Sequence, residues 1–197
     1  MPPKPKFTRE EIVSAALDVV SEKGMDALTA RELGARLGSS ARPIFTVFRN
    51  MEELQTEVRA AAMRRFEGYA DKESGGMPEF KRAGMQMVMF AVEEPKLYQL
   101  LFMQENSAAV SFDDVFGCLG STAEKCIDAI CRDYGLTRQD AGTLFENVWV
   151  YTFGVGALCA TGACRFSEER LGRMLTTQFQ AMMMWVSSHS SGDAGNV

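Results

Sequence analysis

The sequence predicts an all-α protein with a small amino-terminal domain and a larger helical body. Apolar residues recur at intervals of three and four along nearly the whole chain, and alternating β-branched residues are almost absent. A hydrophobic content of 46% over 197 residues is enough for one compact domain or for a small module joined to a larger one. We expect roughly nine helices, in domains at residues 1–54 and 55–188, with a polar, disordered tail at 189–197.

The first predicted helix has clear signals at both ends. Thr8 opens it, and Glu11 three residues later completes a capping box, in which each side chain accepts from the other residue's backbone N–H. Gly24 ends it in a left-handed conformation. The expected inner face consists of Ile12, Ala16, Val19 and Val20.

The second predicted helix repeats this pattern. Thr29 and Glu32 form a second capping-box sequence, and Gly38 closes the helix. Leu33 and Leu37 are its expected inward pair. Both helices are therefore delimited by their own side chains.

The third predicted helix begins at Ser39 or Ser40 and buries Ile44 and Phe48, which are four residues apart. Pro43 is compatible with it only in the first turn, where the missing N–H has no helical partner. The residue before a proline is biased away from helical angles, so this start is the least defined of the set.

Asn50 caps the fourth predicted helix, which runs to about Tyr69. A glycine-containing polar linker follows at residues 71–77. Thr137 and Ser167 are the expected caps of the last two helices. The remaining helices are expected near 78–94, 96–106, 111–134, 138–161 and 167–187.

Residues 29–54 predict a helix-turn-helix that lays one helix into the major groove of DNA. Helices this short are not stable alone in water, and a tight glycine turn between two of them is typical of DNA-reading units. The side chains that the core does not use form either an ordinary solvent face or a surface that meets DNA. The candidate DNA contacts are Thr29, Ser40, Ala41, Arg42, Phe45, Thr46 and Arg49.

The chemistry of these side chains suits DNA. Ser40 and Ala41 are small enough for the backbone to approach closely, and the guanidinium of Arg42 can match a guanine edge or bind a phosphate. Thr46 can bond to a base or a phosphate oxygen. Phe45 can pack on a sugar or a thymine methyl, and an exposed aromatic at this position favours DNA reading over an inert surface.

Charge and residue usage restrict the other function classes. Residues 1–50 hold eight Lys/Arg and six Asp/Glu, whereas the whole chain has a net charge of −5, which suits docking on phosphates by one end. The single histidine lies in a polar tail, and the chain lacks a nucleophile motif, a phosphate loop and metal-ligand spacing. We expect no enzyme, no catalytic residue, no metal and no cofactor. Without a long apolar run or a secretory signal, we expect a cytoplasmic protein with no membrane partner.

The cysteines leave one alternative open. They are expected to be reduced, buried thiols, at positions 118, 126, 131, 159 and 164. A redox sensor would use Cys126 with Cys131, or Cys159 with Cys164, although a five-residue spacing does not place two thiols on one helix face. A small helical enzyme is a third and weaker alternative.

Residues 8–54 resemble the amino-terminal helix-turn-helix domain of the TetR family of transcriptional regulators. The resemblance is close over about the first quarter of the chain, and beyond it extends only to size and helical character. The positions that carry it are Ile12, Ala15, Ala16, Val20, Gly24, Thr29, Leu33, Gly34, Leu37, Gly38, Ser40, Ile44, Phe45, Phe48, Glu53 and Leu54.

Three positions depart from the family pattern. Ser39 stands where the family usually has valine or isoleucine, and Val47 stands where it often has histidine or tyrosine. Met51 stands where the family commonly has a phosphate-binding lysine, so that role is not carried over. The cations that can replace it are Arg49, Lys4 and Lys6.

The resemblance implies a homodimer and a ligand pocket. In this family the last two long helices pair with those of a second subunit, which here implies helices 138–161 and 167–187. Dimerisation also suits the DNA prediction, because two amino-terminal helix-turn-helix domains (the heads of the dimer) related by a two-fold axis read two half-sites of a palindromic operator. Residues 94–102 resemble a subset of the family named for a tryptophan, a histidine and a glycine; Trp149 and Gly154 occupy two of these places, and Phe153 replaces the histidine.

The expected effector is a small apolar molecule. Thirteen methionines and thirteen phenylalanines suit an adaptable apolar cavity, although ordinary core packing is the alternative for each of them. The candidate pocket residues are Met87, Phe90, Phe102, Met103, Phe116, Trp149 and Phe153. The resulting hypothesis is a repressor whose ligand favours a spacing of the two heads that does not fit the operator.

Overall fold

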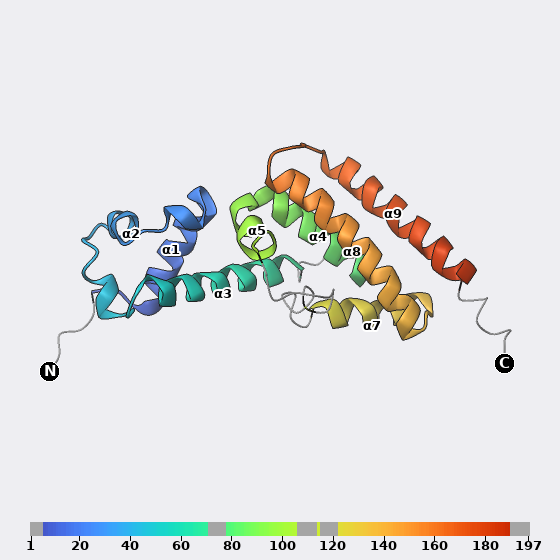
Figure 1. The fold of residues 1–197 in the computed structure, drawn as a ribbon, viewed down its shortest axis with the longest axis horizontal. Coiled ribbons are helices and arrows are strands. Elements are labelled where there is room, and N and C mark those ends of the chain that lie inside the picture. Colours follow the sequence, from blue (N-terminus) through green and yellow to red (C-terminus); the bar gives the residue numbers. More distant parts are fainter. Residues whose placement is uncertain (1–5, 71–77, 106–113, 115–121, 190–197) are drawn as a thin grey trace. The chain divides into compact units, whose positions relative to one another are not determined.

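The structure is a computed structural model, and it describes residues 6–70, 78–105, 114 and 122–189. These residues form eight α-helices and two 3-10 helices and contain no strand, which confirms the all-α expectation (Figure 1). Among the described helices, none is long and apolar enough to cross a membrane.

The chain divides into two compact units. The first unit comprises the residues up to 68 together with 94–104, and the second unit comprises 69–93 and the residues from 105 onward. The linker predicted at 71–77 and all but the first residue of the predicted tail lie outside the described residues. The functional domain boundaries at 54 and 188 stay predictions.

Helix α1 (Arg9–Lys23) opens the first unit with the predicted cap. Thr8 Oγ1 accepts a hydrogen bond from Glu11 N (3.1 Å), and the Glu11 carboxylate accepts one from Thr8 N (2.8 Å). The helix ends at Gly24, whose φ of 88° is one that L side chains rarely adopt. The predicted inner face is fully buried and consists of Ile12, Ala16, Val19 and Val20.

Helix α2 (Ala30–Arg36) contacts α1 and follows a 3-10 turn, η1 (Met25–Ala27). Thr29 caps it as predicted, because Thr29 Oγ1 accepts from Glu32 N (3.1 Å). The other half of the predicted capping box is wrong. The Glu32 carboxylate accepts instead from Lys23 Nζ (2.5 Å), and Thr29 N donates to a carbonyl of η1 (2.9 Å).

The third predicted helix is wrong in kind, because the chain forms a single 3-10 turn in its place, η2 (Ile44–Thr46). Thr46 N donates to Pro43 O (3.2 Å), which is the i to i−3 pattern of a 3-10 helix. Pro43 has no N–H to donate and disfavours a helical residue before it, so no α-helix extends back to residue 39 or 40. The predicted core pair, Ile44 and Phe48, is buried all the same.

Helix α3 (Met51–Ala70) begins at the predicted Asn50 cap, whose Oδ1 accepts from the backbone N–H three residues later (2.9 Å). Helix α5 (Pro95–Phe102) belongs to the same unit and contacts α1. The rings of Phe66 and Phe102 meet edge to face with centroids 5.0 Å apart. The buried side chains of α3 and α5 are Leu54, Val58, Ala62, Phe66, Leu97, Tyr98 and Leu100.

Glu94, which precedes α5, is a buried carboxylate with partners from two other helices. Only 7% of the residue is exposed. Ser21 Oγ of α1 donates to its carboxylate (2.6 Å), and Arg65 of α3 forms an ion pair with it. Because a carboxylate is costly to bury without partners, these contacts hold the start of α5 against α1 and α3.

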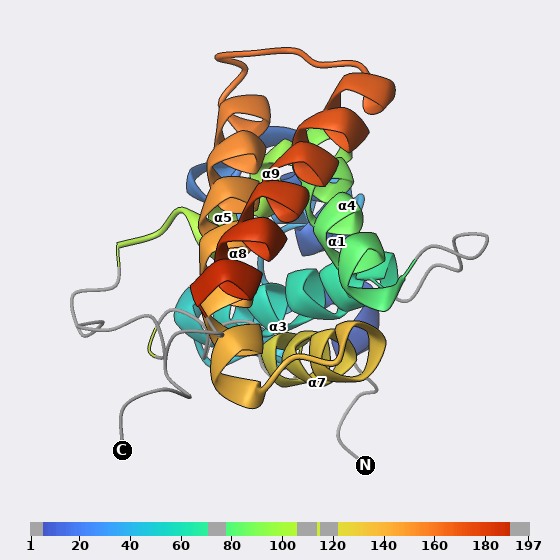
Figure 2. The ribbon, with the colours of Figure 1, turned by 90° about the vertical axis from the view of Figure 1, so that its right-hand side faces the viewer.

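The second unit is a bundle in which α8 lies beside three other helices. Its helices are α4 (Glu79–Glu93), α7 (Thr122–Tyr134), α8 (Arg138–Ala160) and α9 (Glu168–His189). Helix α8 contacts α4, α7 and α9 (Figures 1 and 2). The predicted caps form, since Thr137 Oγ1 accepts from Asp140 N (3.1 Å) and Ser167 Oγ from Arg170 N (3.3 Å). The helix predicted at 111–134 is described as a continuous helix only from residue 122.

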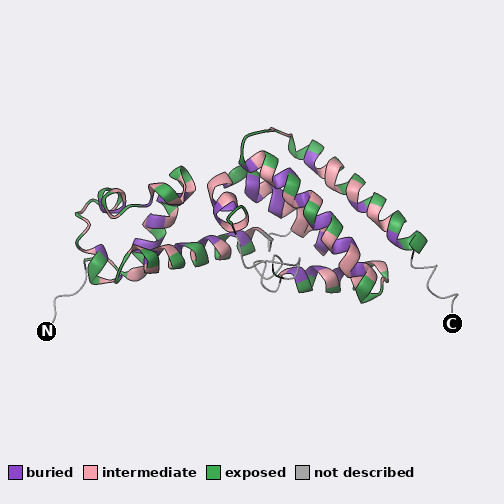
Figure 3. Ribbon diagram, in the orientation of Figure 1, coloured by how far each residue is buried: buried purple, intermediate pink, exposed green. Residues whose placement is uncertain are grey.

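The core of the second unit follows the helical spacing of its apolar residues (Figure 3). Phe80 of α4 lies between two other aromatic rings, with centroid distances of 6.1 Å to Phe145 and 5.8 Å to Phe179. A second buried cluster joins α4, α8 and α9 and consists of Val88, Val155 and Leu171.

Candidate nucleic-acid interface

The turn between α2 and η2 passes close to the backbone of α2 at Gly34. A Cβ atom at Gly34 would lie 3.0 Å from both Ala41 N and Ser40 C. Ser39 N donates to Gly34 O (2.8 Å), and Gly38 has a φ of 61°. The two glycines therefore set the path of the chain that presents the predicted DNA contacts.

Six of the seven predicted DNA contacts are exposed, namely Thr29, Ser40, Arg42, Phe45, Thr46 and Arg49. Ala41 is half-buried beside Gly34. Phe45 is 46% exposed, whereas Ile44 and Phe48 on either side of it are in the core. The 3-10 turn thus separates core and surface side chains as the predicted helix would, but over fewer residues. That these side chains touch DNA stays a prediction.

The two threonines differ in what they can offer to DNA. Thr46 Oγ1 donates to Pro43 O (2.6 Å), so its oxygen is left as an acceptor, which matches a base amino group better than a phosphate. Thr29 Oγ1 accepts from Glu32 N (3.1 Å), which leaves its proton for a phosphate oxygen.

Carboxylates of the first unit neutralise four of its basic side chains. Arg9 pairs with Glu53 and Glu57 (both 3.0 Å), and its guanidinium carbon lies 4.3 Å from the centroid of the Phe48 ring. The hydrogen bond from Arg49 N, with a further contribution from Arg9, lowers the pKa of Glu53. The other three ion pairs are Lys23–Glu32, Arg36–Glu22 and Arg65–Glu94.

Three arginines near the α2–η2 turn have side chains that form no ion pair or hydrogen bond within the described part of the chain: Arg31, Arg42 and Arg49. Sequence reasoning selected Arg42 and Arg49 but missed Arg31, because an arginine in a short helix is typical of an ordinary solvent position. The one sequence signal that could have indicated Arg31 was its position in the first turn of the helix that Thr29 caps. A free guanidinium presents five donors and can bind a phosphate or a guanine.

The predicted ligand-pocket residues do not lie in one unit. Met87, Phe90, Trp149 and Phe153 belong to the second unit, where Met87 and Phe90 are buried and the Trp149 and Phe153 rings stack with centroids 5.4 Å apart. Phe102 and Met103 belong to the first unit, and Phe116 lies outside the described residues. Their common role in a pocket stays a prediction.

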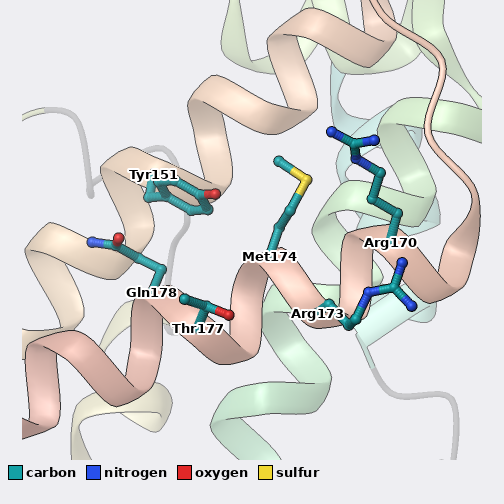
Figure 4. Close-up of a pocket in the computed structure, with 6 residues that line it drawn as sticks. All are labelled: Tyr151, Arg170, Arg173, Met174, Thr177 and Gln178. Atoms are coloured by element: carbon teal, nitrogen blue, oxygen red, sulfur yellow. The ribbon is translucent and has the colours of Figure 1, made fainter.

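A groove of about 440 Å³ opens between α8 and α9 (Figure 4). None of the predicted pocket residues lines it. Tyr151 of α8 faces it from one side, and the other lining residues come from α9, namely Arg170, Arg173, Met174, Thr177 and Gln178. Its lining includes two arginines, although more of the wall is apolar than polar.

The described cysteines are free thiols; Cys126 is buried as expected, whereas Cys131, Cys159 and Cys164 are only half-buried. Burial raises the pKa of Cys126 to about 12. The pKa of Cys159 is also raised, first by burial and second by Cys164. Because the thiolate is the reactive form, these shifts count against the redox-sensor alternative. Cys118 lies outside the described residues, and within the described part no group of acidic, cysteine or histidine side chains is arranged to hold a metal ion.

Comparison with protein families gives a match over residues 12–58 to the model described as bacterial regulatory proteins, tetR family. This range contains α2, the turn, η2 and the first part of α3. Comparison with curated proteins gives no match.

Solved structures extend the likeness to the rest of the chain. A TetR-like transcriptional regulator from Rhodococcus sp. RHA1 is 18% identical with a TM-score of 0.64, over 92% of this chain and 99% of that one. A TetR variant from Acinetobacter baumannii AYE, in complex with minocycline, is 18% identical with a TM-score of 0.55, over 91% and 98%. The fatty acid degradation regulator FadR from Bacillus halodurans is 14% identical with a TM-score of 0.61, over 92% and 96%. At these identities the likeness establishes the fold.

Proposed function

We propose that this chain, whose residues 12–58 match the tetR family model, is a DNA-binding transcriptional regulator, and that it is a homodimeric repressor that a small molecule releases from a palindromic operator. The observation that carries the DNA part is the segment from Thr29 to Arg49, in which exposed side chains and three unpaired arginines flank a turn shaped by two glycines. The further parts rest on separate observations.

Arg42 is the proposed base-reading side chain. It is exposed, it follows the turn directly, and its guanidinium is not occupied by a carboxylate of the described chain. A guanidinium can form two parallel hydrogen bonds to a guanine edge. Ser40, Ala41, Phe45 and Thr46 would form the rest of the groove-facing surface, with Thr29, Arg31 and Arg49 toward the backbone.

Exposed apolar side chains on α8 and α9 support a homodimer. Val150 and Leu158 on α8 are 44% and 42% exposed, and Met184 and Trp185 on α9 are 75% and 47% exposed. Large apolar side chains that gather at a surface commonly mark a protein interface. A two-fold pair built on these helices would present two heads to two half-sites.

The proposed effector is a small apolar molecule held in the second unit. The stacked Trp149 and Phe153 rings, with buried Met87 and Phe90, supply the soft, aromatic lining that such a ligand needs. The minocycline complex of the Acinetobacter protein is a precedent in this fold for a bound small molecule.

A gel-shift titration with the DNA that flanks the gene tests the proposal. We expect Arg42→Ala to weaken binding by about 1–3 kcal/mol, roughly 5- to 150-fold, for each of the two half-sites, and to relax the preference at one base pair in each. Arg64→Ala on α3 removes a similar exposed charge and should bind like the wild type. A folded wild-type protein that shifts no flanking DNA at low salt would overturn the DNA-binding role.

A further inference from the structure

A lysine attaches the segment before α1 to the α2–η2 turn. Lys6 Nζ donates to Ser39 Oγ (3.1 Å), although the two residues are 33 positions apart in the sequence. Lys6 Nζ also lies 5.2 Å from the centroid of the Phe7 ring, a cation–π distance that restrains the side chain. An ammonium group is therefore held at Ser39, the residue that precedes the proposed groove-facing Ser40.

The charge of Lys6 is available, unlike that of several neighbouring cations. Arg9, Lys23 and Arg36 each face a carboxylate, and their charges are neutralised within the first unit. Lys6 has a neutral hydroxyl as its polar partner and no ion pair within the described residues. A neutral partner places the lysine without cancelling its charge.

The remaining donors of this pair suit a single phosphate group. An ammonium group has three donors, and one of them is used by Ser39 Oγ, so two remain. The Ser39 oxygen accepts from Lys6, which leaves its hydroxyl proton for donation. A phosphate oxygen beside the turn could therefore accept from both residues at once.

We propose that Lys6 and Ser39 form a phosphate clamp that fixes the α2–η2 turn on the DNA backbone. This inference rests on the proposed DNA-binding function and adds a contact outside the helix-turn-helix itself. The clamp positions the turn and carries no sequence information. The competing explanation is that Lys6 only attaches the amino-terminal segment to the protein.

Lys6→Gln separates these two explanations, because glutamine can still donate to Ser39 but has no charge. The matched control is Lys96→Gln, which removes the same charge from α5 of the same unit. In Figure 1, α5 lies near the end of α3 that is farther from the α2–η2 turn. The measurement is the DNA dissociation constant of each full-length protein as a function of salt, on the flanking DNA and on unrelated DNA of equal length.

Each phosphate contact contributes about −0.9 to the slope of log K against log salt, so losing it in both subunits makes the slope less negative by about 1.8. The affinity ratio of wild type to Lys6→Gln should then shrink about 12-fold between roughly 50 and 200 mM salt, on both DNAs. Ser39→Ala should weaken binding by about 2- to 10-fold without changing the slope. Lys96→Gln should retain the wild-type slope.

An unchanged slope for Lys6→Gln, with normal binding by the wild type, would overturn the clamp and leave the proposed function intact. The clamp is equally overturned if Lys6→Gln and Lys96→Gln change the slope by the same amount, because the effect would then come from net charge. A wild type that binds neither DNA would overturn the proposed function and the clamp together.

Discussion

Replacing Arg65 by methionine removes the charged partner of the buried Glu94 carboxylate. Among the described residues, Ser21 is then the one remaining side chain that donates to it. Methionine keeps an unbranched apolar stem that can cover the same surface, so the change is mainly electrostatic. We expect it to weaken the attachment of α5 to α1 and α3.

The size of the effect follows from the exposure of the two partners. Breaking a fully buried ion pair from one side costs about 3–5 kcal/mol, because a charge is left buried and unpaired. The Glu94 side chain is 8% exposed, but that of Arg65 is 40% exposed, so water can reach the space that the guanidinium leaves. We therefore expect a loss of about 1.5–3 kcal/mol in the free energy that holds α5 in place.

Hydrogen exchange measures this loss of stability at α5 directly. Both tryptophans, at 149 and 185, belong to the second unit, so intrinsic fluorescence does not report on the first. The backbone amides of α5 and the end of α1 should lose protection by roughly 10- to 150-fold in Arg65→Met. Arg64→Met, the adjacent exposed arginine on α3, should stay within about threefold of the wild type.

A double-mutant cycle tests whether Arg65 and Glu94 interact directly. Glu94→Gln retains an acceptor for Ser21, and in its presence Arg65→Met should cost about 1–2 kcal/mol less than it does alone. Additive effects of the two substitutions would refute a direct stabilising interaction between Arg65 and Glu94. Equal losses of α5 protection in Arg64→Met and Arg65→Met would refute it as well.

Two other substitution or labelling experiments follow from single contacts. Gly34→Ala should lower DNA affinity by at least about tenfold. Its Cβ would lie 3.0 Å from backbone atoms of residues 40 and 41, so the α2–η2 turn must shift. The cost of this shift outweighs the gain in helix propensity of about 1 kcal/mol. Gly68→Ala on α3, where a Cβ meets nothing within 4 Å, should bind DNA normally, and equal binding by both variants would contradict the close approach. Because burial raises the pKa of Cys126 to about 12, iodoacetamide at pH 8 should alkylate Cys126 far more slowly in the folded protein than in urea, as followed by peptide mass spectrometry. Reaction at the unfolded rate would restore the redox alternative.

Local signals in the sequence were sufficient for most of the helices. Thr8, Thr29, Asn50 and Thr137 each cap a helix through a backbone N–H three residues away, so their roles depend on neighbours that the sequence displays. The core face of α1 was equally predictable, because helical spacing alone selects it.

Long-range contacts account for what the sequence did not reveal. Glu32 satisfies the pattern of a capping box, but Lys23 competes for its carboxylate, and only the packing of α1 on α2 brings the two together. The same holds for the pairs of Arg9 with Glu53 and Glu57, which decide which cations remain free for DNA. The 3-10 turn at η2 depends on the hydrogen bonds that form around Pro43, and the apolar spacing of its core residues fits either kind of helix.

The membership of residues 94–104 in the first unit has a consequence for biosynthesis. The chain leaves this unit after residue 68, forms α4 in the second unit, and returns with α5. A nascent chain that ends before residue 94 therefore lacks Leu97, Tyr98 and Leu100 from the core that α1 and α3 share with α5. The first unit is therefore complete only after α4, a helix of the second unit, has been synthesised. A chain terminated before α5 would therefore expose the apolar surface of α1 and α3 that α5 otherwise covers.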